Sequence, residues 1–200
     1  MAITQGHEVL CCDKNRRGGI KNIWLVESGD ITGGAAAVTF GGTDGEIDAF
    51  PTTEAYPFEF DRNTAGFNAN ATRENGSTLV NVELEFYIPK ITQEVRNRLT
   101  ELTQSCGVHA VVESYADDCA GTPATYFFVL GFDTIFLDDS YLEFSSGDMS
   151  TGVGLQDANG TAIKLVGVQG EYPIEIIVDG GTAGVTMTAG SATTDAWTIS

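Results

Sequence analysis

Residues 81–105, NVELEFYIPKITQEVRNRLTELTQS, place an alternating segment directly before the clearest helical pattern of the chain. In 81–88 apolar residues alternate with polar ones, which is typical of a strand with one face in water. In 91–105 apolar residues recur at spacings of 4, 4 and 3, which indicates an amphipathic helix. Thr92 is a suitable N-cap for this helix, and Gly107 is a suitable residue for the turn that ends it. We therefore expect one helix that packs on a sheet.

The sequence on either side of this stretch predicts further strands. Residues 108–113 and 125–130 are apolar on both alternating faces, so we expect central strands that are covered on both sides, with the helix as one cover. The polar segment 67–73 is expected to pair with 81–88 across a turn at Asn75-Gly76, and its edge is available to a strand of another subunit. The remaining expected strands are 20–26, 56–60, 141–144, 162–168 and 174–178, with further turns at Asp44-Gly45 and Asn159-Gly160. The fold class is mainly β, a β-sandwich or small barrel with one packed α-helix at about 91–105.

The length and composition predict a single domain over residues 1–200. A chain of 200 residues with 42% apolar residues can bury enough surface for one core. Two stretches fit that core less well, namely the Gly-rich loop 28–53 and the C-terminal segment 180–200. Each is either a loop or an extended arm, and we expect both to order against neighbouring subunits.

The charge balance disfavours two classes of partner. The chain carries 10 lysines and arginines against 28 aspartates and glutamates, a net charge of −18. Binding of nucleic acid depends on cations that displace counterions from phosphates, so a protein that grips DNA is not expected. No segment reaches the roughly 18 to 20 apolar residues of a spanning helix, and no membrane partner is expected. The N-terminus lacks a secretory signal pattern, so the expected compartment is the cytoplasm.

The sequence also lacks the residue patterns of an enzyme. His7 and His109 lie far apart, and His109 falls in an apolar strand pattern where a structural role is the better interpretation. The four cysteines have no metal-ligand spacing. The acidic pairs Asp117-Asp118 and Asp138-Asp139 and the segment 157–160 do not match the spacing of a calcium loop, and solvated turns explain them. We therefore expect no catalytic residues, no cofactor and no metal site.

The order of these parts resembles the major tail tube proteins of long-tailed bacteriophages. The resemblance covers residues 5–180 and is carried by RENGSTLVNVELEFYIPKITQEVRNRLTEL (73–102) and TGVGLQDANGTAIKLVG (151–167). It implies a β-sandwich with a flanking helix, hexameric rings whose joined sheets form an inner barrel, and stacking of those rings into a DNA conduit. The Gly-rich segment 28–53 stands where such proteins carry a stacking loop.

The resemblance also implies partners and a location. They are other copies of this chain, other virion proteins and DNA that passes without specific binding; the subunit would assemble in the host cytoplasm and reside in the virion. An acidic wall suits a conduit because it does not trap phosphates. On this interpretation Glu83 and Glu85 face the lumen, although simple solubility or a saline habitat explains the same net charge.

Packing acidic subunits together concentrates the few cations at subunit contacts. The cations considered for this role are Arg16, Arg17, Lys21, Arg62, Arg73, Arg96 and Arg98. Two other functions fit the same composition. One is another virion component, such as a head decoration or capsid-associated protein, and the other is a secreted β-sandwich that binds glycans or a cell surface.

Overall fold

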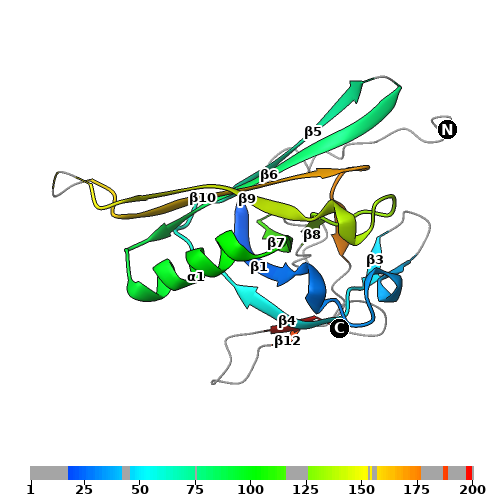
Figure 1. The fold of residues 1–200 in the computed structure, drawn as a ribbon, viewed down its shortest axis with the longest axis horizontal. Helices are drawn as coiled ribbons and strands as arrows, with labels where there is room; N and C mark the ends of the chain where they lie inside the picture. The colour runs from blue at the N-terminus through cyan, green and yellow to red at the C-terminus, as the bar shows by residue number, and fades with distance from the viewer. Residues whose placement is uncertain are drawn as a thin grey trace.

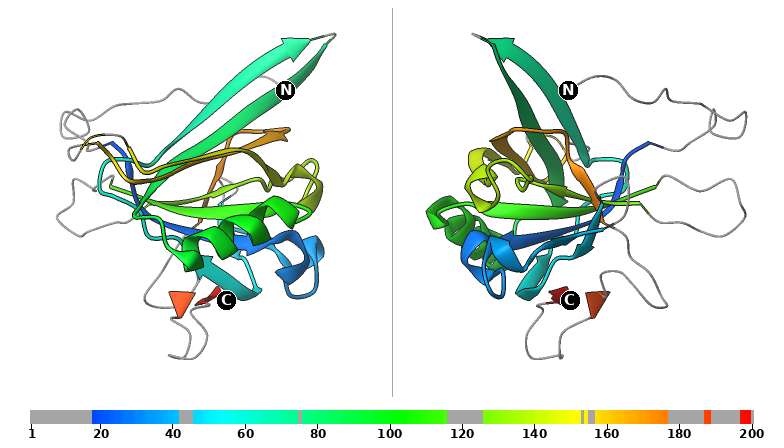
Figure 2. Two further views of the ribbon diagram at one scale, coloured as in Figure 1. Left: turned by 60° about the vertical axis from the view of Figure 1, so that its left-hand side comes forward. Right: turned by 90° about the vertical axis from the view of Figure 1, so that its right-hand side faces the viewer.

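The chain folds into two packed layers of β-strands with one α-helix at their side, as shown by a computed structural model (Figures 1 and 2). The structure describes residues 18–41, 46–74, 76–115, 126–152, 154, 157–176, 187–188 and 197–199. Within these residues the fold is mainly β with a single α-helix, which confirms the expected fold class.

Layer one contains the four longest strands, in the order β5-β6-β10-β9. They are β5 (Gly66–Glu74), β6 (Ser77–Pro89), β10 (Gly160–Gln169) and β9 (Leu142–Ser150). The hairpin β5–β6 pairs in continuous antiparallel register from Gly66↔Glu85 to Glu74↔Ser77, as expected. Because β10 ends opposite Val80, the outer part of this hairpin projects beyond the layer (Figure 1).

Layer two is built around β7, with β1 on one side and β8 on the other. Its strand order is β12-β13-β4-β1-β7-β8-β11-β3-β2. The bounds are β1 Ile20–Glu27, β2 Thr39–Phe40, β3 Ile47–Ala49, β4 Thr52–Pro57, β7 Val108–Ser114, β8 Phe127–Leu130, β11 Ile174–Ile176, β12 Met187–Thr188 and β13 Trp197–Ile199. A single pair, Val108↔Leu142, links β7 to β9 and so joins the two layers.

The inner cluster of buried side chains fills the space between the layers. Layer one contributes Val82, Leu84 and Leu165, and layer two contributes Leu25 and Val112. Burial alternates along β6, so its odd-numbered residues face away from the cluster. Val82 and Leu84 of this cluster belong to the alternating pattern of 81–88 that predicted a strand with one buried face.

The helix α1 (Gln93–Gln104) adds to the inner cluster from the side. Leu102 and Phe86 are buried in the cluster, and the half-buried Leu99 and Phe128 pack against it. The backbone N–H of Val95 donates to the Thr92 hydroxyl at 3.2 Å, which confirms the N-cap. The helix is two residues shorter at its start and one shorter at its end than the predicted 91–105.

The outer cluster covers the opposite face of layer two. It contains Trp24, Val111, Val129 and Phe132, and the strands β7 and β8 are thus covered on both faces as predicted. The second cover is a part of the Gly-rich segment 28–53, not the helix. That segment supplies the buried side chains Ile31, Val38, Ile47 and Phe50.

The segment 28–53 is consequently not the uncommitted loop that we expected. Its described parts form the short 3-10 turns η2 (Ser28–Asp30) and η3 (Ala35–Ala37), the strands β2 and β3, and the start of β4. Its apolar residues are too widely spaced to show a period, but they find partners in layer two. The expected turn at Asp44-Gly45 lies outside the described residues. In the C-terminal segment 180–200, the described strands β12 and β13 pair with each other and with β4.

Several predicted boundaries are wrong. The strand expected at 56–60 begins at Thr52 and ends at Pro57, because the chain then turns to pack Phe58 and Phe60 against the inner cluster. The strand expected at 141–144 extends to Ser150 through pairing with β10.

The expected turn at Asn159-Gly160 is also wrong, because Gly160 begins β10 opposite Pro89. A Cβ there would lie 2.3 Å from the Ile88 carbonyl oxygen, so close approach explains this glycine.

Candidate functional site

The outward face of layer one is the most distinctive polar surface of the described chain. Alternation places Asn68 and Asn70 of β5 on this face, and cross-strand register aligns Asn68 with Glu83 and Asn70 with Asn81. On β10 the outward residues include Lys164. The charged members of this face are Glu83, Glu85, Glu143, Asp148 and Lys164, and we call the surface the acidic face.

Lys164 is held between two carboxylates on the acidic face. Its Nζ lies 2.8 Å from Oε2 of Glu83 and 3.0 Å from Oε1 of Glu85. The hydrogen bonds that Lys164 donates to Glu83 and Glu85 raise the pKa of Lys164 above its ordinary value. Among the side chains that the structure describes, Lys164 is the only cation of the face and is neutralised by its neighbours, and four carboxylates stand against this one ammonium group.

The structure brings the two predicted lumen residues together. Glu83 and Glu85 both lie on β6 and both point to the outward side. Sequence reasoning missed Lys164, Glu143 and Asp148, which share the face through β9 and β10. The signal was present for Lys164, which stands alone between Ile163 and Leu165 in an alternating strand.

Both edges of the four-stranded layer are open over most of their length. In the described chain β5 pairs only with β6, so the edge 66–74 is free. At the other edge, β9 is paired with β7 only through Leu142. The register shifts by one residue at Ser145, where a bulge separates 142–144 from 146–150. The free edges are therefore 66–74 and 146–150, on opposite sides of the acidic face.

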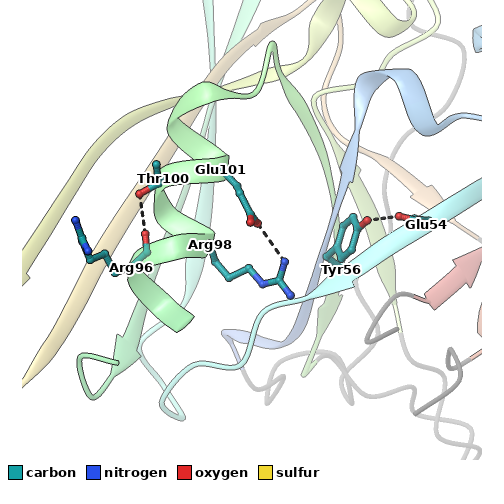
Figure 3. Close-up of polar contacts among 6 residues, drawn as sticks. All are labelled: Glu54, Tyr56, Arg96, Arg98, Thr100 and Glu101. Atoms are coloured by element: carbon teal, nitrogen blue, oxygen red, sulfur yellow. Dashed lines mark hydrogen bonds and ion pairs between the residues drawn. The ribbon is translucent and has the colours of Figure 1, made fainter. Parts of the chain in front are cut away.

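Four of the six arginines considered for subunit contacts lie in three places of the described structure. Arg62 lies in the connection before β5, Arg73 near the tip of the projecting hairpin, and Arg96 and Arg98 on α1. Figure 3 shows Arg98 paired with Glu101, with 3.1 Å between Nη1 and Oε2. Arg62, Arg73 and Arg96 form no ion pair with any described residue, so their charges remain available to a neighbour. Lys21 instead pairs with Glu113, and Arg16 and Arg17 lie outside the described residues.

A second group of ionisable residues lies on layer two. The Tyr56 hydroxyl donates to a carboxylate oxygen of Glu54 (Figure 3). This hydrogen bond and partial burial raise the pKa of Tyr56 to about 12. Partial burial and the Glu54 charge raise the pKa of Asp30. Tyr56 therefore stays protonated at neutral pH and is not an activated nucleophile.

His109 is a buried structural residue, as interpreted from the sequence. Its Nδ1 lies 2.6 Å from the Gly131 carbonyl oxygen, and its ring packs edge-on against Phe50 and Phe132. Within the part of the chain that the structure describes, no three histidine, cysteine, aspartate or glutamate side chains form a metal-binding group. The pair Asp117-Asp118 lies outside that part. None of the described helices has the length and apolar character to cross a membrane.

Comparison with protein-family models, characterised proteins and solved structures finds no match to this chain.

Proposed function

We propose that this chain is a structural virion protein, a tail tube subunit that assembles into stacked rings around a DNA conduit. One observation carries the proposal. The four-stranded layer has an acidic outward face, and on each side of that face lies a strand edge that pairs with no other described strand. A free edge exposes unpaired N–H and C=O groups that another strand can bind.

In the proposed ring, the edge of β5 pairs with the 146–150 edge of β9 in the next subunit. These two edges are different surfaces, so the contact is heterologous and closes into a ring when the rotation between subunits is suitable. The six-fold symmetry implied by the resemblance remains part of the proposal. The joined layers form an inner barrel, and the acidic face lines its bore.

The electrostatics of this face support a conduit for DNA. Phosphates bind where cations can displace their counterions. On the acidic face the one lysine is already engaged by Glu83 and Glu85, and the remaining charges are negative. DNA would therefore pass without specific binding. The partners proposed are other copies of this chain and other virion proteins, with assembly in the host cytoplasm.

Proline substitutions on β5 test the pairing of edges. Neighbouring residues of an edge strand direct their N–H groups alternately toward the partner strand and toward the free side. Of the two variants Asn70→Pro and Ala71→Pro, one therefore removes a ladder bond to β6, and the other removes only a free-edge donor.

The variant with the intact ladder is recognised by a thermal midpoint close to that of the parent. We expect it to remain folded and to form no rings in electron micrographs. Thr103→Ala on the exposed side of α1 is the matched control and should assemble normally. Ring formation by both proline variants at the concentration where the parent forms rings would refute pairing through β5.

A further inference from the structure

Large apolar side chains are exposed together at one end of the sandwich. Ile135 is 59% exposed, Tyr172 58% and Phe136 41%. Phe40 and Leu137 are each 38% exposed. These five residues, the apolar end, surround two adjacent turns. A Cβ at Gly170 would lie 2.8 Å from Cδ1 of Ile135, so Ile135 packs on the turn that leads to Tyr172. Phe40 stacks on Phe132, just before the other turn.

The turn that carries the apolar end is held firmly. The buried carboxylate of Asp133 accepts hydrogen bonds from the backbone N–H groups of Ile135 at 2.8 Å, Phe136 at 2.5 Å and Gly170 at 2.6 Å. It also accepts from the Ser140 hydroxyl at 2.7 Å. A surface organised before binding loses less entropy when a partner docks. Isolated exposed apolar residues are ordinary, but a fixed group of five is typical of an interface.

The surroundings of the apolar end are acidic. The described segments 31–41, 46–50, 131–140 and 169–176 contain no lysine or arginine. Exposed or half-buried carboxylates in these segments include Glu46, Asp48, Asp139 and Glu171. A partner that covers this end must therefore bring cations to meet the acidic rim.

Unpaired cations lie at the opposite end of the same molecule. The strand β10 has ten residues and separates the two ends by about 30 Å. Beside its first residue, the Lys90 N–H donates to the Asn159 carbonyl at 2.8 Å. Arg62 lies near the same end, because the backbone N–H of the preceding residue, Asp61, donates to the carbonyl of Tyr87 on the neighbouring strand β6.

Arg96 lies in the first turn of α1, which starts at this end (Figure 1). We call Arg62, Lys90 and Arg96 the cation end. None of these side chains forms an ion pair with a described residue. Asp61 and Glu94 lie nearby but leave the three cations unpaired.

We propose that the apolar end of one copy docks head to tail on the cation end of a second copy. The three unpaired cations match the acidic rim, and the fixed apolar side chains supply the area that is removed from water. Because the two ends differ and lie on opposite sides of the subunit, the contact is heterologous, and it repeats along an axis when the rotation between copies does not close. This inference rests on the proposed function, in which it is the contact between stacked rings.

The first experiment removes the apolar contact. The variant Ile135→Ser/Phe136→Ser changes exposed side chains and should fold like the parent. Sedimentation velocity and electron microscopy should show rings that no longer stack, with at least a tenfold rise in the concentration needed for tubes, about the effect of losing 1.4 kcal/mol. Val168→Ser, 45% exposed on the acidic face, is the matched control and should stack. Stacking of the double variant at the parental concentration would overturn the inference.

The second experiment tests which end meets which. Arg62→Glu/Arg96→Glu reverses the cation end, and Asp48→Lys/Asp139→Lys reverses the rim of the apolar end. Each variant alone should stack poorly because like charges then face each other, and a mixture of the two should stack again. A mixture that stacks no better than its components contradicts head-to-tail docking.

These outcomes separate the docking contact from the tube. Head-to-tail chains without rings would support docking and contradict the tube subunit. Stacked rings in the Ile135→Ser/Phe136→Ser variant would support the tube subunit and contradict docking through the apolar end. Capture of a different virion protein by the apolar end, with normal stacking, would assign this end to that partner and overturn the inference. A parent that stays monomeric contradicts both proposals.

Discussion

Replacing Asp133 by Asn keeps the size of a fully buried side chain but removes its charge and half of its acceptor capacity. The Asn carbonyl oxygen can still accept from the N–H groups of Ile135 and Phe136. Its NH2 group then faces the Ser140 hydroxyl, which can rotate, and the Gly170 N–H, which cannot. The variant therefore leaves the part-buried N–H of Gly170 facing another donor.

The expected loss of stability follows from these contacts. A buried donor without an acceptor costs about 1 to 3 kcal/mol. Hydrogen bonds to a charged acceptor are also stronger than those to a neutral acceptor. We expect Asp133→Asn to lower the free energy of unfolding by about 2 to 4 kcal/mol at pH 7. The assay is urea unfolding followed by tryptophan fluorescence. Asp139→Asn, an exposed neighbour, is the matched control and should change stability by less than about 0.5 kcal/mol.

The pH dependence gives a second measurement. Burial raises the pKa of Asp133, but hydrogen bonds from Phe136, Gly170, Ser140 and Ile135 outweigh it and hold the pKa below the ordinary 3.8. Its contribution is therefore present above pH 3.8 and is lost as the pH falls through the lower folded value. The parent should lose its advantage over Asp133→Asn at that acidic limit. A difference below about 0.5 kcal/mol at pH 7, or one that stays constant down to acid unfolding, would refute this account of the turn.

Two further predictions concern the helix and the acidic face. Leu102→Ala should lower the free energy of unfolding by about 2 to 4 kcal/mol, and Leu99→Ala, half-buried, by less; equal small losses in urea unfolding would mean that α1 does not pack on the inner cluster. Glu83→Lys/Glu85→Lys should fold but lose roughly 1 to 2 kcal/mol, because Lys164 loses both carboxylate partners and faces two like charges. Co-sedimentation should show DNA retained by its tubes at low salt and released at high salt. The control is Glu94→Lys, a charge reversal at an exposed residue outside the acidic face. If the parent, the double variant and this control release DNA equally at every salt concentration, Glu83 and Glu85 do not line the lumen.

The sequence predicted the elements whose pattern is local. Strand 81–88 and the helix beginning after Thr92 both carry a regular apolar period, and the hairpin turn at Asn75-Gly76 has its own residue preference. These features depend on neighbours within a few residues. Their boundaries shifted only where tertiary pairing lengthened a strand or where a residue next to the helix, Thr92 or Ser105, has extended backbone angles.

The parts that sequence reasoning missed depend on distant partners. Ile47 and Phe50 lie in a Gly-rich segment without periodicity, yet they are buried because layer two supplies the surface that covers them. Residues 145–150 have little strand propensity and are held by β10. The ion pairs of Lys164 with Glu83 and Glu85 depend on cross-strand register, which places Lys164 opposite Glu85. No local pattern encodes that register.

A three-dimensional reconstruction of the purified chain by electron cryomicroscopy tests the central claim most directly. The account predicts closed rings or tubes in which β5 of one subunit pairs with 146–150 of the next. Glu83, Glu85 and Lys164 should line the bore. Isolated monomers or trimers, or rings that carry this acidic face on their outer surface, would contradict it.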